Sequence, residues 1–304
     1  MKNTILLFLL LIITNKLFTQ TFQEYLSKGD SLYKIKEFKL AGTEFDNAFK
    51  IKEGSVGNIS FAAKSWAFVG DTVKTLHYLN ILANKGWYLE EIIKNDSTFI
   101  FLHKLTEWKN ILKKIQANLD EHEKNYNKPL KAELENMIIK DQTLRLLIKE
   151  AEDKFGKNSK KMKYFWHLIA WQDSINEKRV HEIINQYGWP GISLVGEKAN
   201  TAVWLVIQHT SPETQELYLP YLRESVKRGE SSAYDLAYLE DRILSNKGLP
   251  QKFGTQIDIN PETGEYKLYK LEDPKNVNVR RAEIGLEPIE KYLKMFNIEF
   301  DNNK

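Results

Sequence analysis

The chain has 304 residues, of which 42% are hydrophobic and 28% charged, and its formal net charge is +3 at pH 7. The length suits about two domains, and the composition is ordinary for a globular protein. A charge this close to zero excludes the strongly basic surface of nucleic-acid-binding proteins and predicts no strong attraction to anionic lipid. Cys is absent, which excludes a disulfide framework and a Cys nucleophile.

Residues 1–20 differ in character from the rest of the chain. Lys2 gives a positive start, an apolar run extends from Ile5 to Ile13, and polar residues return at Thr14. This pattern is typical of a secretory signal peptide, and the run is too short to span a bilayer comfortably as a helix. We therefore expect a signal peptide here and export of the mature protein to the bacterial periplasm or the cell exterior. An uncleaved membrane anchor is the alternative, and no later stretch approaches transmembrane length.

Residues 22–115 open with a sequence repeat. Gly29 corresponds to Ala63 and Phe45 to Leu79, and the offset in both pairs is 34 residues (29 to 63 and 45 to 79). This is the period of a helix–turn–helix repeat, in which small residues let helices approach and large ones fill the space between them. The segment resembles tetratricopeptide repeats closed by short capping helices, and the resemblance implies a groove for a peptide or partner protein. An ordinary pair of helical hairpins predicts the same fold.

Polar residues dominate 116–130, which we interpret as a linker, and a second domain is expected over 131–297. Helical periodicity recurs in that domain, with Gly188 placed to end one helix and Ser232 placed to begin another. Alternating apolar and polar residues on both sides of a turn predict a β-hairpin over 256–271. The expected fold is mainly α: an N-terminal helical-repeat module, then a second helical domain that carries a small β-hairpin.

Several short strings between about 130 and 295 resemble a bacterial domain family of unknown function. They are Asp141-Gln142 with Arg145, Gly188-Trp189-Pro190, Trp204-Leu205-Val206 with Gln208-His209, Asp241-Arg242-Ile243-Leu244, and Phe253-Gly254-Thr255-Gln256. The resemblance implies a domain of this kind over nearly the whole second part of the chain, and it implies no activity. Phe253 stands where many members have Tyr, so any function that the Tyr hydroxyl has in those members is absent from this chain.

His209 is the first candidate for a functional side chain. It follows Gln208 at the end of an apolar helical pattern. Because an imidazole titrates near neutrality, a His in this place can act as a general acid or base. The alternative is a His at a helix C-terminus that donates to the last helix carbonyls.

A second group of candidates follows in the chain. Tyr238, Asp241 and Arg242 lie three and four residues apart and so share one side of a helix. We weigh an anion clamp, in which Asp241 orients Arg242 or a neighbour, against an internal salt bridge to another helix. Thr255 and Gln256 come directly after a glycine in a loop, where backbone and side chains can approach a ligand closely.

Asp141 and Arg145 form a further candidate, an i,i+4 pair that matters only if it points at the other groups. The 6 His are scattered, and neither a His-Glu-x-x-His string nor a Gly-x-Ser-x-Gly elbow occurs. Local spacing thus supports neither a metal site nor a nucleophilic Ser. We expect no metal and no cofactor.

Two functional hypotheses remain, and we favour the first for the chain as a whole. It is a binding or scaffolding protein of the cell envelope, which holds a protein or peptide in the groove of its helical repeats. The second is a hydrolase-like or small-ligand-binding enzyme with a site around His209, Asp241, Arg242 and Gln256. Convergence of those side chains in space discriminates between the two hypotheses.

Overall fold

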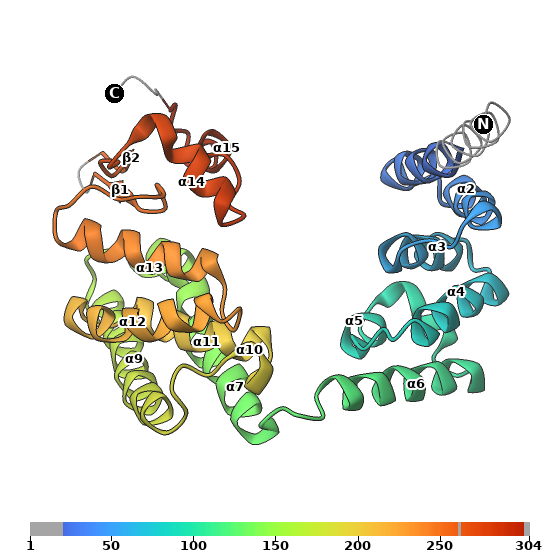
Figure 1. The fold of residues 1–304 in the computed structure, drawn as a ribbon, viewed down its shortest axis with the longest axis horizontal. Coiled ribbons are helices and arrows are strands. Elements are labelled where there is room, and N and C mark those ends of the chain that lie inside the picture. The colour runs from blue at the N-terminus through green and yellow to red at the C-terminus, as the bar shows by residue number, and fades with distance from the viewer. Residues whose placement is uncertain (1–20, 261–262, 301–304) are drawn as a thin grey trace, which may run out of the picture. The chain divides into compact units, whose positions relative to one another are not determined.

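The computed structural model describes residues 21–260 and 263–300, so the signal peptide predicted for residues 1–20 lies outside the described residues. The chain divides into two compact units, Met1–Lys124 and Asn125–Lys304. Both units consist mainly of helices, and the described part of the chain holds one two-stranded sheet (Figure 1). The expected mainly α fold with a small β-hairpin is confirmed.

The first unit is a succession of helices, of which the earlier ones pack on their neighbours in the sequence. They are residues 21–34, α2 (Phe38–Ile51), α3 (Val56–Val69), α4 (Thr72–Asn84), α5 (Glu90–Lys94), the 3-10 helix η1 (Ser97–Leu102) and α6 (Thr106–His122). Small residues allow close approach, since a Cβ at Gly29 would lie 2.8 Å from the Phe45 ring and one at Gly42 would lie 2.7 Å from the Trp66 ring. Phe45 and Leu79 are fully buried in the core of this unit.

Local capping sets the junction between α3 and α4. Ser55 and Asn58 form a capping box at the start of α3. Gly70 ends this helix in the left-handed conformation, with φ at 79°, and Asp71 then caps α4 by accepting from the backbone N–H of Lys74. Gly70 and Asp71 together therefore form the turn between α3 and α4.

The second unit is larger and ends in the sheet and two short helices. Its elements are α7 (Lys128–Leu146), α8 (Ile148–Phe155), α9 (Lys160–Tyr187), α10 (Ile192–Val195), α11 (Glu197–Gln208), α12 (Pro212–Lys227), α13 (Ala233–Asn246), β1 (Ile257–Ile259), β2 (Tyr266–Leu268), the 3-10 helix η2 (Pro274–Asn276), α14 (Val277–Glu283) and α15 (Ile289–Lys294). Gly188 follows the last residue of α9, and Ser232 caps α13 through Tyr234 N–H. The polar residues 116–130 lie largely within the end of α6 and the start of α7.

Helix α11 occupies the centre of the second unit, because it packs against α7, α9, α10, α12 and α13. Its apolar residues explain this position: Val203 and Ile207 are fully buried, together with Leu134 of α7 and Val180 of α9. The helix ends at Gln208, and the next residue is its C-cap. The C-terminal end of α11 is therefore held among helices from three other stretches of the chain.

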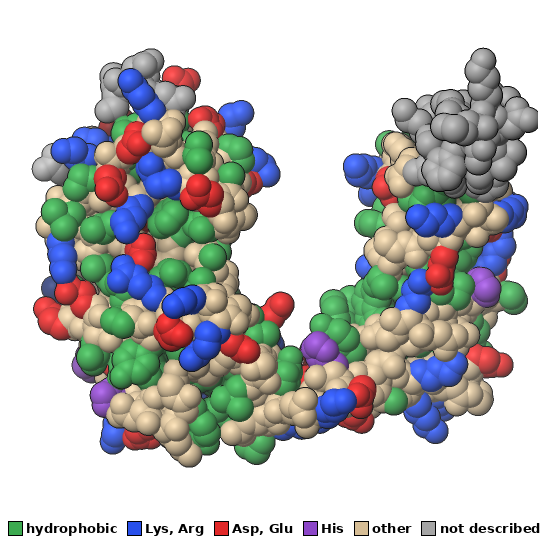
Figure 2. All heavy atoms as spheres, in the orientation of Figure 1, with side chains coloured by type: hydrophobic (Ala, Val, Ile, Leu, Met, Phe, Trp, Pro, Cys, Tyr) green, Lys and Arg blue, Asp and Glu red, His purple; other side chains and the backbone are tan. Residues whose placement is uncertain are grey.

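The β-hairpin is shorter than predicted. Strands β1 and β2 pair antiparallel, with Ile257 opposite Leu268, and each has three residues. A small apolar core, which includes Val277 and Leu293, joins the hairpin to α14 and α15. Charged side chains of both signs are interspersed over the visible surface, as the near-neutral charge predicts (Figure 2). Among the described helices, none combines the length and apolarity needed to cross a membrane.

Candidate functional site

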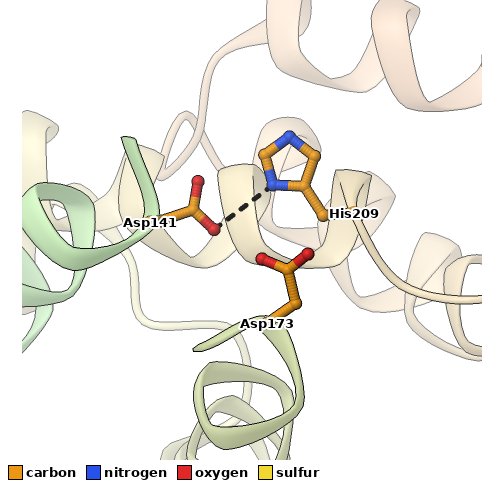
Figure 3. Close-up of side chains that lie close together, drawn as sticks. All are labelled: Asp141, Asp173 and His209. Carbon is orange, nitrogen blue, oxygen red and sulfur yellow. Dashed lines mark hydrogen bonds and ion pairs between the residues drawn. The ribbon is translucent and has the colours of Figure 1, made fainter. Parts of the chain in front are cut away.

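Three helices of the second unit bring Asp141, Asp173 and His209 together (Figure 3). Asp141 lies near the end of α7, Asp173 lies within α9, and His209 is the C-cap of α11. One nitrogen or oxygen atom from each of the three side chains lies within 4.8 Å of the other two. Because these residues come from three separate elements, the packing of α7, α9 and α11 determines their geometry.

Asp141 is the buried member of this group, with 2% of the residue exposed. Its Oδ1 atom lies 3.2 Å from Nδ1 of His209, and its Oδ2 atom accepts from Nε2 of Gln142 at 2.6 Å. Burial by itself raises the pKa of Asp141, but the hydrogen bond from His209 and the charges of His209 and Arg145 outweigh it, and the pKa lies below its ordinary value. Asp141 is therefore a carboxylate at neutral pH.

The carboxylate of Asp141 fixes the proton of His209. Since an ionised carboxylate only accepts hydrogen bonds, Nδ1 of His209 carries the proton, and Nε2 of the neutral ring is left as an acceptor. The side chain of His209 is 22% exposed, and among the described residues none hydrogen bonds to Nε2. Figure 3 shows Nε2 on the side of the ring away from Asp141. This is the arrangement of an oriented base with solvent access.

The structure assigns the helix-capping role, which was the alternative for His209, to other side chains. The backbone carbonyl of Gln208 accepts from Nη1 of Arg242 at 2.9 Å and from Nε2 of Gln215 at 3.2 Å. His209 uses only its backbone N–H in the last turn, which donates to Val206. Its imidazole is thus free for the contact with Asp141.

Arg145 joins the carboxylates of the cluster. Its Nη2 atom donates to both oxygens of Asp173, at 2.9 and 2.8 Å, and its Nη1 atom donates to the backbone carbonyl of Asp141 at 2.9 Å. Nη1 also lies 3.7 Å from Oδ1 of Asp141. The predicted i,i+4 pair therefore does point at His209. With a neutral imidazole the group has two negative charges and one positive charge, which leaves a net charge of −1.

Two carboxylates and an imidazole are also a ligand set that Zn²⁺ or Mn²⁺ accepts. The contact of 3.2 Å between Nδ1 of His209 and Oδ1 of Asp141 is a hydrogen bond, so a metal ion held by these two atoms would have to displace the proton between them. Arg145 would also have to release Asp173, because a guanidinium and a metal ion repel each other. The present contacts favour proton transfer over metal binding. Spacing in the sequence could not reveal this ligand set, because its members come from three helices.

Asp241 belongs to a second, separate group. Its carboxylate is fully buried and accepts from the backbone N–H groups of Lys252, Phe253 and Thr255, at 2.7 to 3.1 Å, and from Oγ1 of Thr255 at 3.0 Å. Burial raises the pKa of Asp241, and these four donors lower it in part. Gln256 donates to Oγ1 of Thr255 at 3.1 Å. Asp241 therefore fixes the conformation of the loop and does not orient Arg242.

The predicted site residues thus divide between two places. Asp141, Arg145 and His209 meet in one cluster. Tyr238, Asp241, Thr255 and Gln256 meet at the loop, where Nε2 of Gln256 lies 3.4 Å from the backbone carbonyl of Tyr238. Arg242 and Gln208 meet at the end of α11. The five residues His209, Asp241, Arg242, Gln256 and Asp141 do not form a single site.

Asp173 is the functional candidate that sequence reasoning missed. It lies on one face of α9 with Ile169, Asn176 and Val180, all of which are buried. An acidic residue on the buried side of a helix is uncommon, and Asp173, whose side chain is 22% exposed, needs a partner for its charge. The sequence shows Asp173 and Arg145 separately, but it does not show that the packing of α7 on α9 pairs them.

The second unit corresponds to a known family of uncharacterised proteins. A family model described as a family of unknown function, DUF6624, matches residues 128–302, and the chain belongs to this family. No curated protein and no solved structure matches the chain. The resemblance of the second domain to a family of unknown function is confirmed, and the family matched brings no activity with it.

The ionised state of Asp141 predicts a pH dependence of stability. Because its pKa is lowered on folding, the carboxylate stabilises the folded chain above about pH 4 and loses this effect as the pH falls through the folded-state pKa. We expect Asp141→Asn to lower the free energy of unfolding at pH 7 by roughly 2 kcal/mol, and the difference from wild type to shrink below about pH 4.

Urea titrations between pH 3 and 7 measure this difference. The matched control is Asp153→Asn, which removes a carboxylate that is 63% exposed on α8 and should change stability little at any pH. A difference for Asp141→Asn that stays constant across the whole pH range would contradict the assignment.

Proposed function

We propose that the second unit is a hydrolase-like acid–base catalyst in which His209 is the base and Asp141 orients it. One observation carries the proposal: Asp141 accepts the Nδ1–H of His209, and Nε2 is left free on a ring that is 22% exposed. A buried carboxylate on Nδ1 holds an imidazole in one tautomer and stabilises the imidazolium that forms when Nε2 takes a proton. The pairing of Arg145 with Asp173 adds rigidity, because it ties α7 to α9 beside the base.

The reaction class that fits this geometry is water-dependent cleavage. Nε2 of His209 would take a proton from an attacking water while the oxygen of that water bonds to the substrate. The proton would then pass from Nε2 to the leaving group, so that His209 returns to its neutral state. Asp141 stays ionised throughout, since its role is electrostatic.

His209→Ala should abolish this activity. General-base catalysis supplies about 100-fold or more, so we expect at least that loss in kcat/KM. The measurement is turnover of a panel of chromogenic carboxylic esters, phosphate esters and amides by the full chain. The matched control is His167→Ala, which removes an exposed His from α9, the helix that carries Asp173, and should leave the rate unchanged. Equal rates for His209→Ala and wild type, or no turnover of any substrate class, would overturn the proposal.

We propose a second function for the first unit, a tetratricopeptide-like module that binds a peptide segment of a partner protein. Its support is a cluster of aromatic rings on neighbouring helices, which we call the aromatic patch: Tyr33, Phe38, Phe61 and Phe68. Tyr33 lies 5.0 Å from Phe61, and Phe38 stacks on Phe68 at 4.0 Å between ring centroids. Phe61 is 42% and Phe68 49% exposed. Exposed apolar clusters of this kind mark interaction sites, and large aromatic side chains supply much of the contact area there.

Replacing both phenylalanines should weaken peptide binding. Peptides selected from a random display library on the full chain would be measured by fluorescence anisotropy. We expect Phe61→Ser with Phe68→Ser to raise Kd about tenfold or more, since truncated anchor residues typically cost that much. Val73→Ser is the control, because Val73 is 78% exposed on α4, outside the aromatic patch. This function would be contradicted if no peptide were selected, or if the Phe61→Ser, Phe68→Ser double variant had the same Kd as Val73→Ser.

We also propose that the chain acts in the bacterial cell envelope after export. The support is the apolar run from Ile5 to Ile13 behind Lys2, which has the length of a signal-peptide core. Neither proposed function requires nucleic acid or a cofactor.

A further inference from the structure

Several buried polar atoms of α11 and α13 have no hydrogen-bond partner among the described residues. Gln208 is 4% exposed, and neither its Nε2 nor its Oε1 has a hydrogen-bond partner among the described residues. The same holds for the buried Nε of Arg242 and the buried Nε1 of Trp204. Buried polar groups are almost always paired, so several unpaired ones in one place indicate a bound group that completes them.

The residues that carry these atoms lie at one junction between two helices. Trp204 and Gln208 lie one turn apart on α11, and Tyr238 and Arg242 lie one turn apart on α13. The two pairs are in contact: the Trp204 and Tyr238 rings lie 6.2 Å apart in an edge-to-face arrangement, and Nη1 of Arg242 donates to the Gln208 carbonyl at 2.9 Å. Trp204 and Gln208 of α11 thus line the same helix–helix junction as Tyr238 and Arg242 of α13.

Arg242 is a partly buried cation that has no counter-ion among the described residues, and its Nε atom is buried. Among the described residues, no carboxylate lies within 4.0 Å of its guanidinium, whereas Arg145 has Asp173 and Arg223 has Glu240. Asp241, its neighbour in the sequence, is fully engaged with the loop at 252–255. Burial lowers the pKa of Arg242, and no acidic group counters that effect. The cost of withdrawing an unpaired charge partly from water points to an anion as the missing partner.

We propose that the Nε–Nη2 edge of Arg242, with Nε2 of Gln208 and Nε1 of Trp204, binds an oxyanion, the carboxylate or phosphate group of a small ligand. Nη1 is already used by the Gln208 carbonyl, which leaves the Nε–Nη2 edge for a bidentate contact, the geometry that matches both of these anions. The unpaired Oε1 of Gln208 is an acceptor, so it favours a ligand that also carries a hydroxyl or a protonated phosphate oxygen.

The site deepens the proposed catalytic function, on which the following step rests. Gln208 directly precedes His209 at the C-terminal end of α11, and since consecutive helical residues point about 100° apart, a ligand bound at Arg242 has to extend around this helix end to reach Nε2 of His209. The substrate class is then a small anionic compound, whose charged group is held at Arg242 while His209 acts on a neighbouring bond. Binding of the anion itself requires no catalysis and is measured separately.

Thermal unfolding and isothermal titration of the full chain test the anion site. The probes are sodium phosphate and sodium acetate, each compared with sodium chloride at equal ionic strength. We expect a saturable rise in Tm and a measurable Kd with phosphate or acetate but not with chloride, and the probe that binds more tightly identifies the anion. Arg242→Gln should weaken binding at least tenfold. Arg228→Gln, which removes an exposed arginine after α12, should bind as wild type does.

A near-isosteric variant covers the case in which Arg242→Gln does not fold. Gln208→Glu places a negative charge in the proposed site, where it repels an anion, so we expect a folded protein that no longer responds to phosphate or acetate. No saturable effect of either anion on wild type overturns the site, as does equal binding by Arg242→Gln and Arg228→Gln, or wild-type binding by Gln208→Glu. Anion binding that persists in an inactive His209→Ala variant supports the site, and anion binding without any turnover by wild type rejects only the catalytic proposal.

Discussion

A carboxylate removed from water must find donors or positive charge, and this requirement organises the second unit. Asp141 and Asp241 are both buried, and the groups that offset the loss of hydration of each carboxylate come from other segments of the chain. Asp141 draws in His209, 68 residues later, and shares Arg145 with Asp173 on α9. Asp241 draws in three backbone N–H groups of the loop that follows α13.

The two carboxylates have different consequences because their partners differ. The partners of Asp241 are backbone groups, so its effect is to fix a loop conformation and thereby join α13 to the terminal hairpin and helices. The partner of Asp141 is an imidazole with a second ring nitrogen, and fixing one nitrogen prepares the other for proton transfer. Arg242 presents the opposite case, a partly buried positive charge for which the described residues supply no carboxylate partner.

Much of the fold could be predicted because its signals are local. Apolar periodicity predicted the helices, Gly188 and Ser232 mark helix ends where expected, and the alternation around the turn predicted the hairpin. The repeat offset of 34 pairs Phe45 with Leu79, and both are fully buried. These features depend on neighbours within a few turns, which a single sequence displays.

The candidate site could be predicted only in part because its contacts are long-range. His209, Asp141 and Arg145 were each recognised, but nothing in the sequence indicates that α7 and α11 place two of them 3.2 Å apart. Spacing in the sequence places Asp241 and Arg242 in one candidate cluster, although consecutive helical residues point about 100° apart. They accordingly face different neighbours, the loop and the end of α11.

The central claim is that Asp141 fixes His209 as an Nδ1–H imidazole with a free Nε2. Nitrogen-15 NMR of the histidine rings measures this directly, since protonated and bare ring nitrogens differ widely in chemical shift. In the neutral form of wild type, we predict a proton on Nδ1 and none on Nε2 of His209, and a shift toward a mixture of tautomers in Asp141→Asn. A neutral His209 that carries its proton on Nε2 in wild type would contradict the account, because the base would then face Asp141 and not the solvent.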